Sequence, residues 1–293
     1  MQESIVEYVD THFHLWDLKA NYYPWLTDRI LTDHVLGDYS AIRKDYLISD
    51  LLADIAATPV RKGVHIQANI DPQDPVRETK WLQHIADDTV ASRGFPHAIV
   101  AFAPLESPDA ERVIAAHKES PNVRGLRQVL PQDVLDHATF CRNLALLPAY
   151  QLSFDLQIRH PHMAVVAELA ARNPDLQLIV THCGYPLSTE PAYLAAWRAG
   201  MRKLAEYSNV AVKLSGFAFI DPHWTADSLR PLVLEIIDIF GPHRCMFATD
   251  FPVDKVAGEY HAYWAAYETI TAQHSEAERS GMLGGNAERI YRI

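Results

Sequence analysis

The stretch VDTHFHLWD, residues 9–17, begins as an apolar strand and ends with two histidines one residue apart. Side chains alternate between the two faces of a β-strand, so this pattern predicts that Asp10, His12 and His14 share one face. Both imidazoles are therefore expected to point into the same space. The number of further strands along the chain then indicates which fold this first strand belongs to.

Strand-like and helix-like runs alternate along the whole sequence. Eight strands are predicted, at residues 5–14, 63–68, 97–106, 123–130, 152–159, 176–184, 210–216 and 244–252. Amphipathic patterns predict helices between them, at residues 49–57, 75–90, 109–120, 163–174, 225–241 and 258–270. This alternation predicts an α/β fold, a single (β/α)8 TIM barrel over residues 1–293. A doubly wound open sheet is the alternative, but no GxGxxG motif follows a strand to support its dinucleotide-binding form.

The charge balance excludes some classes of partner. Acidic residues outnumber basic ones by 37 to 26, and no run of lysine and arginine is present that would follow a phosphate backbone. The first residues lack the basic and apolar segments of a secretion signal, and no apolar run approaches the ~20 residues needed to span a bilayer. We therefore expect a cytoplasmic protein that acts on a small molecule, without nucleic acid or membrane partners, as a monomer or a homo-oligomer.

Polar residues concentrate where the predicted strands end, which is where TIM barrels carry their active sites. They are His12, His14, Gln67, Arg127, Arg159, His182, Lys213, Ser215 and Asp250. On the sixth predicted strand, alternation places Leu178, Val180 and His182 on one face. That face is thus apolar until its last residue.

The histidines and Asp250 suit the binding of a cation or the activation of water. Two neutral imidazoles at positions i and i+2 can bind one cation, and a carboxylate from a distant strand can supply a third ligand. Asp250 can also take a proton from water. The planar guanidinium groups of Arg127 and Arg159 suit a substrate carboxylate or sugar hydroxyls.

Structural roles are the alternative for the cations. Arg127 and Arg159 can instead brace the barrel through interior ion pairs with Asp155 or Asp10. Lys213 can likewise be structural rather than catalytic.

A long connection, residues 15–48, separates the first predicted strand from the first confident helix. Connections of this length are unusual unless they are functional. This one is rich in aromatic residues, including Trp16, Tyr22, Tyr23 and Trp25. They are predicted to form an apolar wall over the barrel mouth, with Trp16 as the first candidate for substrate contact. Covering the barrel rim, or an oligomer contact, is the alternative.

A set of motifs covers nearly the whole sequence. They are VDTHFHLWD (9–17), YPWL (23–26), IQA (66–68), ETKWL (78–82), GLRQVL (125–130), FDLQIR (154–159), VTHCGYP (180–186), VKLSG (212–216), ATDFPVDK (248–255) and GGNAERIYRI (284–293). Together they resemble the amidohydrolase superfamily, in particular its amidohydrolase-related branch of L-fuconolactonase-like sugar lactonases and 2-pyrone-4,6-dicarboxylate lactonase. This resemblance implies a TIM barrel with hydrolase chemistry.

The resemblance also implies roles for individual residues. His12, His14 and Asp250 match positions that hold a divalent ion, zinc or manganese, and Asp250 matches the acceptor of a proton from the attacking water. His182 matches a ligand or an acid–base group. FDLQIR lacks the strand-five histidine of many metal-dependent members, and no carboxylated lysine is apparent on strand four, so a binuclear site is not expected. Some lactonases of the branch act without a required metal, which leaves metal-independent catalysis as the alternative.

The predicted activity is hydrolysis of a lactone of a sugar acid or a similar carboxylated small molecule. Asp250 and His182 are the predicted catalytic residues. The predicted substrate-binding residues are Arg127, Arg159, Gln67, Trp16 and Lys213. Two alternatives remain open: metal-dependent, non-oxidative decarboxylation of an aromatic or unsaturated acid, and a non-catalytic barrel that binds a small molecule.

Overall fold

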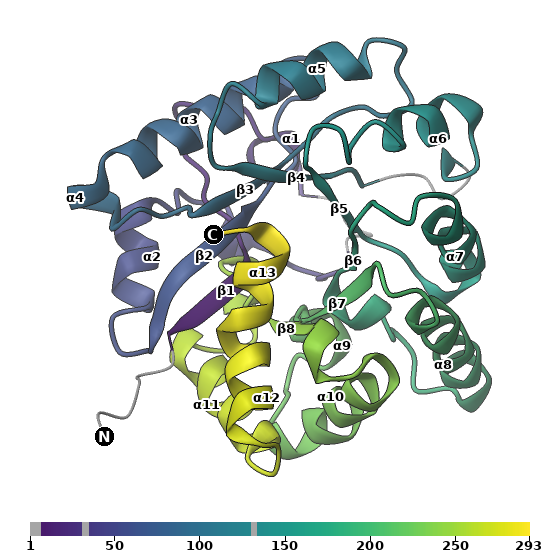
Figure 1. Ribbon diagram of the computed structural model, residues 1–293. Helices are drawn as coiled ribbons and strands as arrows, with labels where there is room; N and C mark the ends of the chain where they lie inside the picture. The colour runs from purple at the N-terminus through teal and green to yellow at the C-terminus, as the bar shows by residue number, and fades with distance from the viewer. Residues whose placement is uncertain (1–6, 31–34, 130–133) are drawn as a thin grey trace.

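A computed structural model describes residues 7–30, 35–129 and 134–293 of the chain (Figure 1). Eight parallel strands form one sheet in the order β1 to β8. Their bounds are β1 Tyr8–Phe13, β2 Val60–Ile66, β3 Ala98–Ala101, β4 Val123–Arg127, β5 Ser153–Leu156, β6 Leu178–Val180, β7 Val210–Leu214 and β8 Cys245–Phe247. Parts of three predictions lie outside the described residues, namely 5–6 of the first strand, 130 of the fourth and 31–34 of the long connection.

The two ends of the sheet meet and close it into a barrel. The amide of His14 donates to the carbonyl of Phe251 at 2.7 Å, and the amide of Asp250 donates to the carbonyl of His12 at 2.8 Å. The Thr11 hydroxyl adds a bond to the carbonyl of Phe247 at 2.9 Å. The predicted TIM barrel is therefore confirmed and the open sheet is wrong, because an open sheet leaves its first and last strands unpaired.

Helices surround the barrel and follow most strands (Figure 1). Their bounds are α1 Pro24–Thr27, α2 Ile48–Asp54, α3 Pro75–Asp87, α4 Thr89–Ser92, α5 Ala110–His117, α6 Ala138–Leu144, α7 Met163–Arg172, α8 Pro191–Ala205, α9 Phe217–Ile220, α10 Ala226–Phe240, α11 Tyr260–Thr271, α12 Glu276–Ser280 and α13 Asn286–Tyr291. The six predicted helices are confirmed as α2, α3, α5, α7, α10 and α11. Within the described ranges, none combines the length and apolar character that crossing a membrane requires.

Two apolar clusters hold the layers together. The larger one packs the outer faces of the strands against the helices. The smaller one fills the barrel from its N-terminal end, and its members are Val9, Val64, Ile66, Ala98, Val100, Ile179, Ala211, Met246, Ala287, Ile290 and Tyr291. Its last three members belong to α13, which crosses the centre of the barrel in Figure 1. The C-terminal helix thus closes one end and leaves the opposite end for a site.

The predicted strand faces are wrong in two places. The pairing of β1 with β2 shifts register between Asp10 and Phe13, so Asp10 does not share a face with the histidines. Its carboxylate instead accepts from the hydroxyl of Tyr260 on α11, outside the barrel, at 2.8 Å. On β6 the inward residue is Ile179, while Leu178 and Val180 pack outward.

Several strands also end earlier than predicted. β6 ends at Val180 and β8 at Phe247, so His182 and Asp250 lie in the loops that follow. Both residues have a positive φ, 49° for His182 and 58° for Asp250. The backbone leaves the sheet at these points, which alternation along a strand does not predict.

A buried ion pair joins strands β5 and β7 inside the barrel. The Lys213 ammonium lies 2.6 Å from Asp155 Oδ2, and both side chains are inaccessible to solvent. The hydroxyl of Tyr291 donates to the same carboxylate at 3.1 Å. Lys213 thus has an internal partner, while Arg127 pairs with neither Asp155 nor Asp10.

We expect the variant Lys213→Met to lose about 3–5 kcal/mol of unfolding free energy, because it leaves a buried carboxylate without its cation. Urea denaturation measures this loss. Lys203→Met is the matched control, since Lys203 pairs with Glu206 at the same 2.6 Å distance but on the surface, where ion pairs contribute about 0–1 kcal/mol. Equal losses in the two variants would contradict the prediction.

Candidate active site

Three imidazoles converge on one buried carboxylate at the open end of the barrel. The Nε2 atoms of His12 and His14 each lie 3.2 Å from Asp250 Oδ1, and His182 Nε2 lies 3.9 Å from the same oxygen. Candidate ligand atoms of His12, His14 and Asp250 all lie within 4.8 Å of one another. The structure therefore brings together the four residues that the sequence pattern singled out from strands one, six and eight.

The hydrogen bonding of His14 defines its tautomer. Nδ1 donates to the carbonyl of Ile66 at 2.7 Å, because a carbonyl oxygen can only accept. Burial lowers the pKa of His14 to about 3, so the ring is neutral and Nε2 carries a lone pair. That lone pair faces the Asp250 carboxylate, which also has only lone pairs to offer when ionised.

His12 and Asp250 complete a set of acceptors that requires a positive charge. Burial lowers the pKa of His12 well below its usual value, and neither ring nitrogen has a hydrogen-bond partner among the described residues. Burial also raises the pKa of Asp250 well above that of an ordinary carboxyl group. A proton or a cation among these atoms relieves their mutual repulsion. Two imidazoles and a carboxylate suit a zinc-like divalent ion.

His182 is oriented by the loop after β7. Its Nδ1 is hydrogen bonded to the hydroxyl of Ser215 at 3.0 Å, which leaves Nε2 facing Asp250. Gly216 makes this approach possible, since a Cβ at that position would lie 2.5 Å from His182 Nδ1. Gly216 also has a φ of 69°, a conformation that glycine adopts without steric cost.

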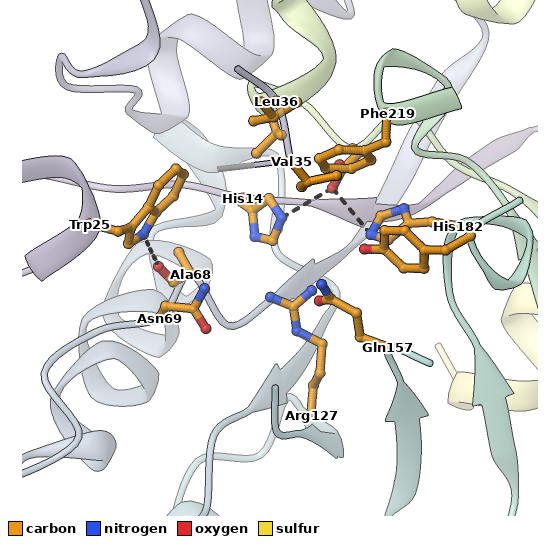
Figure 2. A pocket seen from close by; sticks show the side chains of 13 residues that line it. His14, Trp25, Val35, Leu36, Ala68, Asn69, Arg127, Gln157, His182 and Phe219 are labelled. Atoms are coloured by element: carbon orange, nitrogen blue, oxygen red, sulfur yellow. Dashed lines mark hydrogen bonds and ion pairs between the residues drawn. The ribbon is translucent and has the colours of Figure 1, made fainter. Parts of the chain in front are cut away.

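A cavity of about 200 Å³ opens above these residues. Its lining residues are His14, Trp25, Val35, Leu36, Ala68, Asn69, Arg127, Gln157, His182, Tyr185, Phe219, Asp250 and Val253. In Figure 2, Arg127 and Gln157 lie across the cavity from His14 and His182. One side therefore carries imidazoles and a carboxylate, the other offers polar donors, and apolar side chains complete the wall.

Arg127 is the charged group of the second side. It is buried, and one nitrogen donates to the carbonyl of Gln67 at 2.9 Å. Its Nε has no acceptor among the described residues, and burial lowers its pKa. No carboxylate of the described chain lies within ion-pair distance, so the guanidinium is available to a ligand in the cavity.

The other predicted substrate-binding residues do not line the cavity. Trp16 lies behind His14, with the two rings stacked at 6.3 Å, and its indole donates to the carbonyl of Lys44. The Gln67 side chain folds back on Asn69, and its Oε1 accepts a hydrogen bond from the backbone amide of Asn69 at 2.6 Å. Lys213 is committed to the interior ion pair, and Arg159 is exposed beyond the cavity lining.

Asn69, Gln157, Tyr185 and Phe219 line the cavity but were not predicted from the sequence. Gln157 had a usable signal, because it lies two residues after the inward-facing Asp155. The other three lie in loops or in the short helix α9, where no periodicity reports the direction of a side chain.

Comparison with known proteins identifies the family. The sequence model of the amidohydrolase family (Amidohydro_2) matches residues 9–293. The chain belongs to the amidohydrolase family. This amidohydrolase is 40% identical to an uncharacterized protein of Sinorhizobium fredii, over 99% of this chain and 100% of that protein.

Two further relatives carry descriptive names. An L-fucono-1,5-lactonase of Burkholderia ambifaria is 28% identical over 97% of this amidohydrolase and 95% of that protein. A crystal structure of an amidohydrolase from Burkholderia multivorans with bound zinc has a TM-score of 0.81 and 28% identity, covering 98% of this chain and 99% of that one. Together with the family match, these relatives define this amidohydrolase as a hydrolase of the amidohydrolase superfamily.

We expect Gly216→Ala to reduce turnover about 100-fold, because its Cβ displaces the His182 ring and misplacement of a reacting group by about 1 Å has an effect of that size. Steady-state kinetics on a hydrolysed substrate measures the loss. Gly241→Ala is the matched control, since Gly241 has a φ of 76° but open space around its Cβ. An equal loss of turnover in both variants would show that backbone strain, rather than contact with His182, is responsible.

Proposed function

We propose that this amidohydrolase hydrolyses a lactone of a sugar acid or a similar small molecule. The observation that carries the proposal is the convergence of His12, His14 and His182 on Asp250, across a cavity from Arg127. Hydrolysis of a cyclic ester needs a base for water, a positive or donating group at the carbonyl oxygen, and a proton for the leaving oxygen. The cavity offers side chains suited to all three tasks.

The similarity to L-fucono-1,5-lactonases supports this choice of substrate class. Two such proteins, of Burkholderia ambifaria and Burkholderia multivorans, each match 97% of this chain. A lactone ring carrying several hydroxyl groups suits a cavity that combines Asn69, Gln157 and Arg127 with apolar surfaces.

Asp250 is the proposed base. Its carboxylate is buried and lies at the cavity floor, where burial favours the protonated form and makes the group a stronger base. His182 is the proposed acid–base group beside it, because its Nε2 is free of protein partners other than Asp250. Arg127 holds an oxygen substituent of the substrate and so orients the ring over Asp250.

His12, His14 and Asp250 are proposed to hold one divalent ion such as zinc. The nitrogens of His12, which make no hydrogen bond to the described residues, and the lone pair of His14 facing Asp250 fit such an ion. A bound divalent ion supplies Lewis acidity and lowers the pKa of water. The bond from His14 to the carbonyl of Ile66 orients its ring for this role.

We expect Asp250→Asn to lower kcat on a hydroxylated 1,5-lactone by about 10²–10⁴-fold, the contribution of a general base. A pH indicator measures the carboxylic acid released by ring opening. Asp238→Asn, on the exposed face of α10, is the control and should keep full activity. Turnover by Asp250→Asn at the rate of the unaltered protein would remove Asp250 from the mechanism.

The same protein preparation distinguishes lactone hydrolysis from the alternative reaction, decarboxylation. Aromatic and unsaturated acids are offered in parallel with lactones, and released carbon dioxide is measured. Carbon dioxide without lactone opening would replace the proposal by decarboxylation, and binding without either product would favour a non-catalytic barrel.

Elemental analysis of protein purified without chelator is expected to find about one divalent ion per chain, lost in His14→Ala because one of three ligands is removed. His84→Ala, on the exposed side of α3, is the control and should retain the ion. Metal-free protein with full activity would show that the imidazoles act directly on the carbonyl instead.

A further inference from the structure

The turn after β6 has an unusual backbone. Four consecutive residues have a positive φ: His182 at 49°, Cys183 at 58°, Gly184 at 67° and Tyr185 at 52°. Left-handed conformations normally occur as single residues, and each non-glycine instance costs on the order of 1–3 kcal/mol. Such strain persists only where surrounding contacts enforce it, and it is concentrated at functional positions.

Helix α8 enforces this turn through two side chains. The hydroxyl of Tyr193 donates to the carbonyl of Tyr185 at 2.9 Å, and the indole of Trp197 donates to the carbonyl of Cys183 at 3.0 Å. The carbonyls of the strained segment are thus held from a helix that contributes no side chain to the cavity lining. The turn sets the direction of the side chains of His182 and Tyr185, at its two ends.

The turn places the side chains of both end residues in the cavity. His182 and Tyr185 both line it, and their ring centroids are 5.2 Å apart in an edge-on arrangement. Phe219 packs against both rings, at 5.6 Å from His182 and 5.7 Å from Tyr185. Tyr185 is only 3% exposed, so its position is fixed by packing.

The Tyr185 hydroxyl has no hydrogen bond to the described residues. Most other buried tyrosines do have one: Tyr260 donates to Asp10 at 2.8 Å and Tyr267 to the carbonyl of Ala248 at 2.7 Å. The Tyr185 hydroxyl is not among the fully buried polar atoms that lack a partner, so it is open to the cavity that Tyr185 lines. A ligand that fills the cavity excludes water from this hydroxyl, and the donor then needs an acceptor on the ligand.

The surroundings of Tyr185 keep its phenol protonated, so that the hydroxyl can donate a hydrogen bond. Burial and the Asp250 carboxylate raise the pKa of the phenol well above its usual value, while the Arg127 guanidinium opposes this effect. The hydroxyl therefore keeps its proton at neutral pH and lies within the electrostatic reach of both sides of the cavity.

We propose that the Tyr185 hydroxyl is a specificity-determining donor that binds a hydroxyl group on the lactone ring. This inference rests on the proposed lactonase function and names the feature of the substrate that the site selects. A buried donor left unpaired discriminates strongly against a substrate that lacks the matching oxygen. Tyr185 thus selects polyhydroxylated rings over bare ones.

The test compares Tyr185→Phe with the unaltered protein on two lactones of the same ring size, a hydroxylated aldono-1,5-lactone and δ-valerolactone. We expect kcat/KM on the hydroxylated lactone to fall about 10- to 100-fold, while that on δ-valerolactone stays constant or rises. Tyr8→Phe is the matched control, because it removes a hydroxyl that donates to Glu268 away from the cavity. An equal loss on both lactones, or no loss on either, would overturn the proposal.

A binding measurement separates this inference from the proposed reaction. Calorimetry compares a hydroxylated 1,5-lactam, which is not hydrolysed, with δ-valerolactam. We expect Tyr185→Phe to weaken only the hydroxylated lactam, by the same factor. If that selective loss occurs in a protein that hydrolyses no lactone, the reaction is wrong and the binding role stands. If Tyr185→Phe and the unaltered protein show the same preference between the two lactams, Tyr185 does not bind the ring hydroxyl.

Discussion

Everything at the open end of this barrel depends on one buried carboxylate. Asp250 lies among three imidazoles whose pKa values burial lowers, and its Oδ1 approaches the Nε2 atoms of His12 and His14 at 3.2 Å. Atoms that all carry lone pairs do not stay together without a proton or a cation between them. In the proposed mechanism, whatever supplies the positive charge also polarises water or a carbonyl bound nearby.

Barrel closure and site assembly are the same event. The amide of Asp250 binds the carbonyl of His12, and the amide of His14 binds the carbonyl of Phe251, so the backbone bonds that join the first and last strands also bring these three residues together. Residues nearly the whole chain apart meet in this way. A mutation that weakens closure therefore acts on the chemistry as well as on stability.

Support for the site residues comes from the end of strand β2 and from the loops after β6 and β7. The carbonyl of Ile66 fixes the tautomer of His14, and the hydroxyl of Ser215 orients His182. Gly216 leaves room for that ring. The strained turn of residues 182–185 adds Tyr185 to the same wall. Each of these contacts restrains a side chain of the site, and a displacement of about 1 Å in a reacting group is enough to slow a reaction.

Much of the fold and half of the site follow from local patterns. Eight strands with intervening amphipathic helices predict the barrel, and the first-strand histidines and Asp250 follow from polar residues at strand ends, strengthened by the resemblance to a known superfamily. The strand faces were predicted less well. His182 points inward although Leu178 and Val180 point outward, since its left-handed turn overrides the alternation of the strand.

The sequence by itself determined which residue types stand at the ends of which strands, because periodicity and strand termination depend on neighbours along the chain. Only the tertiary structure decided which cations face a ligand. Lys213 is neutralised by Asp155, 58 residues away, whereas Arg127 is left without a carboxylate. Likewise Tyr185 reaches the cavity because α8 holds its backbone. Pairing and loop direction arise from contacts between distant segments, which a linear pattern does not encode.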